Sequence, residues 1–146
     1  MKDYQNYDAH TLGLGSGINI FFNKGLFHLG INYENRKASQ KTATKFVDAS
    51  FISSDISILY PLTKHINIKT NYLFRKGFYN ENIDTITKAN NKERDDNFHK
   101  ILLKLSYEFN RKTAIYMQGI YSNNSTNYTL TRYKQNIVSV GFSILY

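Results

Sequence analysis

The last eleven residues of the chain, Asn136 to Tyr146, constrain the fold most strongly. Apolar residues occupy every second position of this segment, and small or polar residues lie between most of them. A period of two places alternate side chains on opposite faces of a β-strand, so one face of this strand is apolar. The apolar positions are Val138, Val140, Phe142, Ile144 and Tyr146.

This ending resembles the terminal strand of Gram-negative outer-membrane β-barrels. In those proteins the barrel-insertion machinery reads a final aromatic residue with apolar residues alternating before it. The resemblance implies that the five residues above act as an insertion signal. It also implies outer-membrane lipid and the insertion machinery as partners, and the outer membrane of a Gram-negative bacterium as the location.

The alternation recurs along the chain and predicts six further strands. It is clearest around Leu103, where apolar residues from Ile101 to Phe109 alternate with Lys100, Lys104 and Glu108. The six segments are Thr11–Phe22, Leu26–Asn35, Phe46–Tyr60, Ile66–Tyr79, Asn97–Phe109 and Thr113–Tyr121. We therefore expect residues 1–146 to form a single all-β domain, an antiparallel up-and-down transmembrane β-barrel segment of about seven strands.

The predicted connections alternate between short and long, which is typical of outer-membrane barrels. The short turns are Asn23–Gly25, where we expect Gly25 to supply a positive φ, Pro61–His65 and Asn110–Lys112. The long, polar connections are Glu34–Lys45, Asn80–Asp96 and Ser122–Arg132. Strands that descend to the short turns end in aromatic residues on the apolar face, which predicts an interfacial girdle of Phe22, Tyr60, Phe109 and Tyr146.

The opposite face of the predicted strands is polar and carries charges. Burying such charges in a small core costs several kcal/mol each unless they are paired, whereas a water-filled lumen removes that cost. The predicted lumen-lining residues are His28, Asp55, Asn67, Lys69, Asn71, Arg75, Lys100, Lys104 and Glu108. Positive residues outnumber negative ones on this face, which favours small anionic solutes. A soluble barrel with its apolar face inward remains an alternative.

Bacterial single-chain barrels have an even number of strands and at least eight of them. Seven strands therefore predict an incomplete barrel, with at least one ascending strand expected before Tyr4. The residues after Met1 are polar and do not resemble a secretory signal, so we expect either a mature chain or part of a longer one.

Composition agrees with a lipid-facing β-protein and narrows the function. The chain has 12 Tyr, 10 Phe, one Pro and no Cys, so a disulfide framework and a thiolate site are excluded. The longest apolar run, Ala114 to Met117, is far shorter than a transmembrane helix requires. The net charge of +8 comes from scattered Lys and Arg residues, which disfavours nucleic acid as a partner.

The polar face also contains residue types that serve in catalysis. His28, Ser53, Asp55 and Ser57 permit a Ser-His-Asp arrangement, but no nucleophile elbow accompanies them. No two histidines have metal-ligand spacing, and no helical pattern follows the glycines of Leu12–Gly17. The sequence therefore predicts a protein that is not an enzyme and has no cofactor or metal.

Residues Arg94-Asp95-Asp96, Tyr121–Ser125, Tyr133, Asn136 and the terminal strand resemble the carboxy-terminal end of two related outer-membrane groups. One is a group of β-barrel porins, and the other is the barrel of surface lipoprotein assembly modifiers. The resemblance covers about the last third of the chain. It implies a porin-like channel or transport barrel, or alternatively a translocation barrel that exports a lipoprotein. A soluble β-barrel that binds a ligand or nucleic acid is the alternative from another class.

Overall fold

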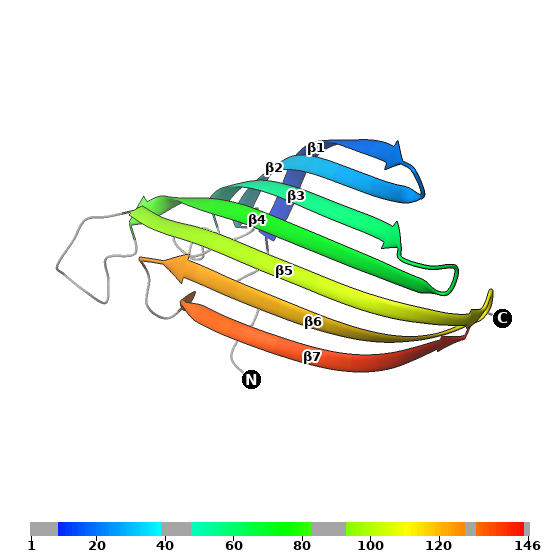
Figure 1. The fold of residues 1–146 in the computed structure, drawn as a ribbon. Coiled ribbons are helices and arrows are strands. Elements are labelled where there is room, and N and C mark those ends of the chain that lie inside the picture. The colour runs from blue at the N-terminus through cyan, green and yellow to red at the C-terminus, as the bar shows by residue number, and fades with distance from the viewer. Residues whose placement is uncertain (1–8, 39–47, 83–92, 128–130, 145–146) are drawn as a thin grey trace.

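A computed structural model describes residues 9–38, 48–82, 93–127 and 131–144 of the chain. These residues form one antiparallel sheet of seven strands in sequence order (Figure 1). The strands are β1 (Ala9–Phe22), β2 (Gly25–Ala38), β3 (Ala49–Pro61), β4 (Ile66–Asn82), β5 (Glu93–Asn110), β6 (Thr113–Thr126) and β7 (Tyr133–Ile144). The expected all-β, up-and-down antiparallel arrangement is confirmed at this level.

Several strands are longer than the apolar alternation indicates. β2 continues to Ala38, β4 to Asn82 and β6 to Thr126, and β5 begins at Glu93, so parts of the predicted long loops are strand. The backbone ladder continues past the last apolar residue because interstrand hydrogen bonds do not need an apolar face. The middle parts of those loops and Tyr146, the last residue of the predicted insertion signal and girdle, lie outside the described residues.

The turn between β1 and β2 differs from the sequence-based expectation. Asn23 has a positive φ of 50°, whereas no described glycine has one, so the assignment of that role to Gly25 was wrong. Asn tolerates the left-handed region because its side chain bonds locally. Gly25 instead opens β2, where a Cβ atom would lie 2.8 Å from the ring atoms of both Phe22 and Tyr60. Its small size therefore makes room for two aromatic rings.

The strand register divides the side chains into two faces. One face, here called the inner face, includes the row Gly17, Gly30, Asp55, Leu73, Lys100, Ser122 and Gln135, which runs across all seven strands. The neighbouring row, Ile18, Leu29, Ile56, Tyr72, Ile101, Tyr121 and Asn136, belongs to the other face, here called the outer face. Every strand pairing thus places residues of one face beside residues of the same face.

Burial shows towards which face the sheet curves. The buried hydrophobic residues among those described are Ala49, Phe51 and Tyr79, and all three lie on the inner face near the long connections. Large apolar residues of the outer face are exposed, most of all on the edge strands, where Leu14 is 81% and Val138 is 76% exposed. The curved sheet in Figure 1 therefore encloses its polar face and presents its apolar face outward.

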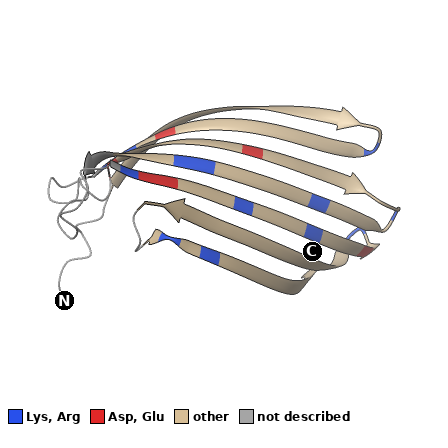
Figure 2. Ribbon diagram, turned by 60° about the vertical axis from the view of Figure 1, so that its left-hand side comes forward, with Lys and Arg blue, Asp and Glu red and all other residues tan. Residues whose placement is uncertain are grey.

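The sheet is open within the described residues. β1 and β7 form its two edges, since β1 pairs only with β2 and β7 only with β6. Both edge strands run towards the end of the sheet that carries the short turns (Figure 1). Charged residues are absent from β1 and β6 and are scattered over the other strands, as Figure 2 shows.

Candidate functional site

The inner face of the sheet brings together all of the residues predicted to line a lumen. The register places them in successive rows, for example Asn67 opposite Ser106, Lys69 opposite Lys104, and Leu73 opposite Lys100. The remaining members, on β2 to β5 of the same face, are His28, Asp55, Asn71, Arg75 and Glu108. The predicted set therefore shares one continuous surface of the sheet.

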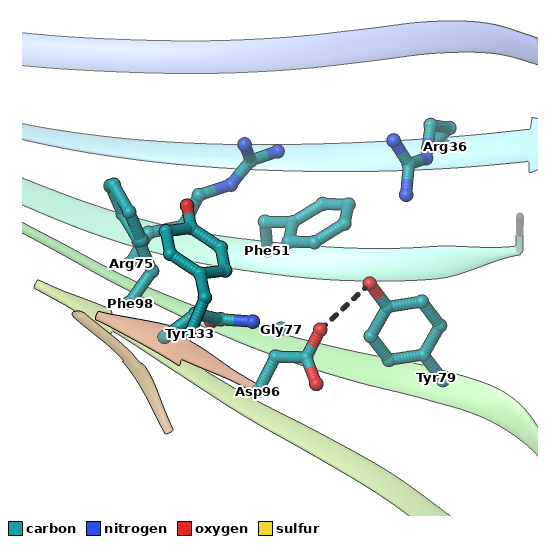
Figure 3. A pocket seen from close by; sticks show the side chains of 9 residues that line it. Arg36, Phe51, Arg75, Gly77, Tyr79, Asp96, Phe98 and Tyr133 are labelled. Carbon is teal, nitrogen blue, oxygen red and sulfur yellow. Dashed lines mark hydrogen bonds between the residues drawn. The ribbon is translucent and has the colours of Figure 1, made fainter. Parts of the chain in front are cut away.

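A pocket of about 280 Å³ lies on the inner face near the long connections (Figure 3). Six consecutive strands contribute to its lining, which shows that the sheet curls strongly at this end. The lining residues are Arg36, Phe51, Arg75, Gly77, Tyr79, Asp96, Phe98, Asn124 and Tyr133. Guanidinium groups and aromatic rings dominate this list, and these pair through cation–π contacts.

Phe51 is the centre of this pocket. The guanidinium carbon of Arg75 lies 3.9 Å from its ring centroid, and that of Arg36 lies 4.9 Å from it. Tyr79 packs edge-on against the same ring at 6.0 Å. Gly77 makes this arrangement possible, because a Cβ atom there would lie 2.9 Å from the ring of Phe51. The aromatic ring therefore holds two cations in place across β2, β3 and β4.

Arg75 also joins β4 to β2 through an ion pair. Its Nη2 donates to Oε2 of Glu34 at 2.9 Å, across the intervening strand β3. The Nε of Arg75 is buried without a hydrogen-bond partner in the described part of the chain, because the ring of Phe51 covers the guanidinium. The carboxylate of Glu34 thus compensates the charge of Arg75, and the ring of Phe51 fixes the plane of the guanidinium.

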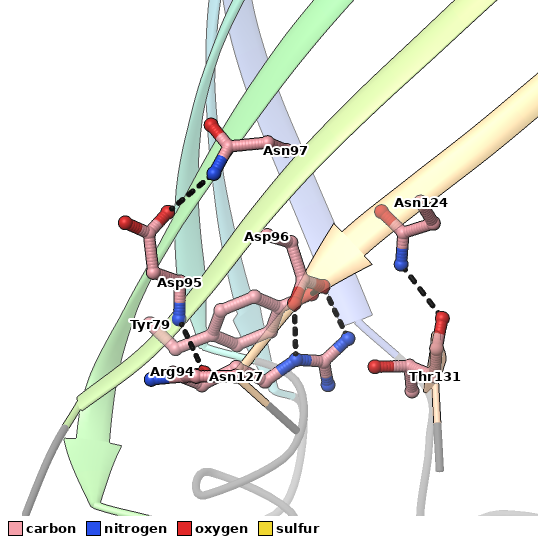
Figure 4. A network of polar contacts seen from close by, with 8 residues as sticks. All are labelled: Tyr79, Arg94, Asp95, Asp96, Asn97, Asn124, Asn127 and Thr131. Atoms are coloured by element: carbon pink, nitrogen blue, oxygen red, sulfur yellow. Dashed lines mark hydrogen bonds and ion pairs between the residues drawn. The ribbon is translucent and has the colours of Figure 1, made fainter. Parts of the chain in front are cut away.

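Asp96 anchors a polar network at the start of β5 (Figure 4). The Arg94 guanidinium binds both carboxylate oxygens of Asp96, and the Tyr79 hydroxyl donates to Oδ2 at 3.1 Å. Arg94 also stacks over the ring of Tyr79, with 4.1 Å to the centroid. This ion pair is almost fully enclosed, with side-chain exposures of 10% and 11%. The network ties β4 to β5 at the mouth of the pocket.

Next to Asp96, the side chain of Asp95 points to the opposite face. Its carboxylate lies 3.4 Å from Nζ of Lys76 and remains half exposed. Asn127 accepts a hydrogen bond from the backbone N–H of Asp95 at 3.0 Å, and Asn124 donates to the carbonyl of Thr131 at 2.8 Å (Figure 4). These contacts connect the ends of β5, β6 and β7 on the side of the long connections.

His28 bridges three strands in the middle of the inner face. Its Nε2 lies 3.3 Å from a carboxylate oxygen of Asp55, and its Nδ1 lies 2.7 Å from Oδ1 of Asn19. Both ring nitrogens therefore have partners that are not serine, although Ser57 is the register partner of His28. The geometry ties β1, β2 and β3 together and does not assemble the Ser-His-Asp arrangement considered from the sequence.

Three lysines of the inner face differ from Arg75 and Arg94 in their charge compensation. Lys69 and Lys104 are direct cross-strand neighbours, and Lys100 follows on β5. None of the three has an acidic partner among the described residues. Nζ of Lys104 instead lies 3.9 Å from the ring centroid of Tyr116.

Aromatic residues gather at the end of the sheet with the short turns. Phe22 and Tyr60, two members of the predicted girdle, stack with ring centroids 6.0 Å apart. Phe109 packs edge-on against Tyr107 at 5.1 Å, and Tyr107 stacks on His65. Tyr107 and His65 are additions to the aromatic group that the sequence predicts.

A second inner pocket, of about 430 Å³, lies at the same end of the sheet. Asn67 and Glu108 belong to its lining, and the Asn67 amide donates to the Glu108 carboxylate at 2.7 Å. Two of the predicted lumen residues are therefore joined directly across β4 and β5.

Sequence reasoning missed most of the pocket at the other end. The alternation assigns three of its residues to loops or strand ends: Arg36, Tyr79 and Asp96. It places Phe51 in a strand but does not distinguish it from the other residues of that strand. The alternation itself contains a signal for these residues. Continuing the two-residue period past Asn35 and before Asn97 places Arg36 and Asp96 on the same face as Phe51.

Neither a metal-binding cluster nor a membrane-spanning helix is present among the described residues. No group of three or more His, Cys, Asp or Glu side chains in residues 9–38, 48–82, 93–127 and 131–144 has the arrangement of a metal site. Over the same ranges, no helix has the length and apolar character needed to cross a membrane. Comparison of the chain with protein-family models, with curated proteins and with solved structures finds no match in any of the three.

Proposed function

We propose that this chain forms part of the wall of a transmembrane β-barrel in a Gram-negative outer membrane, and that the barrel is a porin-like channel or transport barrel without enzymatic activity. The observation that carries the proposal is the polarity of the two faces. Within the span of the apolar band of the outward face, the charged residues of the strands lie on the enclosed face, among them Asp55, Lys69, Lys100 and Lys104. Transmembrane barrels have this polarity, whereas proteins folded in water have the opposite one.

The exposed apolar residues of the outer face support the proposal. Much of the outer face is apolar, including Leu103 at 50% and Phe142 at 59% exposure. Soluble monomers rarely expose contiguous apolar patches of more than a few hundred Å². Lipid chains would cover this surface.

Along the strands, the outer face also has the order expected across a membrane, an apolar band followed by charged residues. On β1 its apolar positions run from Leu12 to Phe22, and a tilted transmembrane strand needs about 9–11 residues. Charged residues of the outer face lie beyond this band, towards the long connections. They include Lys37, Lys76, Asp95 and Lys134. The charged groups of these side chains would then reach the polar interface of the membrane.

The inner face supports a channel or transport role rather than a packed core. It carries Asp55, Lys69, Lys100 and Lys104 outside the two pockets, and Glu108 in the lining of the second pocket. Charges in such positions are stable when water solvates them. A barrel whose wall carries charges along its whole length offers a path for small polar solutes.

Two neighbouring residues on β5 test the membrane assignment. Leu103 lies on the outer face and Leu102 on the inner face. We expect Leu103→Arg to weaken insertion of the refolded protein into lipid vesicles by about 2–4 kcal/mol, because Arg is costly on a lipid-facing surface. Leu102→Arg adds the same charge to the inner face and serves as the matched control, with insertion close to wild type. Equal insertion of both variants, or a wild-type protein that stays monomeric in water without detergent, would contradict the proposal.

The channel role has its own readout. The complete barrel that contains this chain should conduct ions when it is inserted into a planar bilayer. Insertion without conductance would leave the membrane assignment intact and contradict the porin-like function.

A further inference from the structure

Three lysines lie on the inner face of β4 and β5 and are here called the lysine track: Lys69, Lys104 and Lys100. Lys69 and Lys104 are register partners, so their Cα atoms are about 4.5–5.5 Å apart. Lys100 is four residues from Lys104 on β5, which is about 13 Å along the strand. The track lies between the pocket beside Asn67 and the pocket beside Phe98.

The acidic residues of the inner face are engaged elsewhere. Asp55 contacts His28, Glu34 pairs with Arg75, and Asp96 pairs with Arg94. Glu108 accepts a hydrogen bond from Asn67. Within the described residues, both of these arginines therefore have a compensating carboxylate, whereas the lysine track has none.

Lys104 is held in position by an aromatic platform. Its Nζ lies over the ring of Tyr116, and that ring lies across Gly141, where a Cβ atom would be 2.3 Å from the ring. A cation–π contact orients the ammonium and leaves its N–H donors available. Lys69 faces it from β4 without a counter-charge. Two like charges directly opposite in an antiparallel pair are destabilising, and a bound anion would remove that repulsion.

We propose that the lysine track binds small anions that carry more than one negative charge, of the phosphate class. Phosphate oxygens accept charge-assisted hydrogen bonds from ammonium groups, and a divalent anion can bridge two of them. The idea that such anions reach the track along a water-filled wall rests on the proposed function. Binding at Lys69 and Lys104 itself does not require conduction.

Two double variants with equal charge change test the inference. K69Q/K104Q removes two charges from the track, whereas K24Q/K64Q removes two from short turns at the same end of the sheet. The full chain, refolded in detergent micelles, is titrated with inorganic pyrophosphate by calorimetry, and circular dichroism checks that each variant keeps its β-structure. We expect K69Q/K104Q to bind roughly tenfold more weakly or worse, because each charge-assisted hydrogen bond contributes about that factor. K24Q/K64Q should bind like wild type.

The same substitutions in the complete barrel that contains this chain, inserted into a planar bilayer under a KCl gradient, give a second readout. The reversal potential of K69Q/K104Q should shift towards cations relative to wild type and K24Q/K64Q. Absence of pyrophosphate binding by the wild type, or equal weakening in both double variants, overturns the lysine site. A titration that separates the variants while no protein conducts supports the lysine site and contradicts only the porin-like function.

Discussion

Gly17 and Gly30 lie opposite one another in the register of β1 and β2, and side chains of their neighbours occupy the space above them. A Cβ atom at Gly17 would lie 2.9 Å from Cε1 of His28, and one at Gly30 would lie 2.4 Å from Oδ1 of Asp55. The contact between His28 and Asp55 therefore depends on two residues that have no side chain.

We predict that Gly30→Ala lowers the free energy of unfolding by about 1–3 kcal/mol, because the added methyl group displaces Asp55 from His28. Gly119→Ala is the matched control, since no heavy atom other than its own and those of its chain neighbours lies within 4 Å of its Cβ position. The control should be neutral or stabilising by about 0.4–1 kcal/mol, because alanine restricts the unfolded chain. Urea unfolding of the refolded protein, followed by circular dichroism, measures both. Equal stability of the two variants would show that the glycine pair does not position Asp55.

Asp96 and Asp95 are adjacent residues with opposite surroundings. We predict that Asp96→Asn costs about 3–5 kcal/mol of stability, because it leaves the enclosed guanidinium of Arg94 without its carboxylate. Asp95→Asn removes a half-exposed pair with Lys76 and should cost less than about 1 kcal/mol. The same unfolding measurement compares the two variants. A cost for Asp95→Asn that matches or exceeds that of Asp96→Asn would refute the described network.

The chain has no cysteine, so single cysteines report on each face without background. We predict that Ser139→Cys reacts with a water-soluble maleimide in lipid vesicles, whereas Val138→Cys does not, because lipid covers the outer face. Val138 is highly exposed in the isolated chain, at 76%. An outer surface that faces water would leave the cysteine at that position open to the reagent. Faster labelling of Val138→Cys than of Ser139→Cys in vesicles would count against the membrane assignment.

The β1–β2 turn depends on the left-handed backbone of Asn23. We predict that Asn23→Val costs about 1–3 kcal/mol of stability, because a β-branched residue is strained at a positive φ. Asn23→Gly keeps that backbone accessible and should stay close to wild type. Thermal unfolding of both variants checks the prediction. If the Asn23→Val variant unfolds at the wild-type temperature, the turn adopts another conformation.

The sequence predicted most of the sheet because apolar and polar residues alternate along the strands, and every strand pairing keeps the residues of one face together. Leu103 and Lys104, for instance, could be placed on opposite faces without any structure. The ends of the strands could not be placed in this way. Beyond the apolar band both faces of β2 and β5 are polar, as at Arg36 and Asp95, so the alternation of hydrophobicity disappears although the backbone pairing continues.

The pocket around Phe51 shows why the candidate site was only partly predictable. Alternation assigned Phe51 and Arg75 to one face, but it gave no reason for them to touch. Their contact depends on the β3–β4 register, on the absence of a side chain at Gly77, and on the curl of the sheet. These are tertiary properties that no local pattern encodes.

The short turns described above have a consequence for the order of folding. Each joins two strands that are neighbours in the sequence, so closing it costs little chain entropy. The hairpins β1–β2, β3–β4 and β5–β6 can therefore form first, on a timescale of about 1–10 μs. The backbone N–H of Glu108 donates to the carbonyl of His65 at 2.7 Å, which aligns the second hairpin with the third from the turn end. β7 belongs to none of these hairpins, so its pairing with β6 is expected to complete the described sheet.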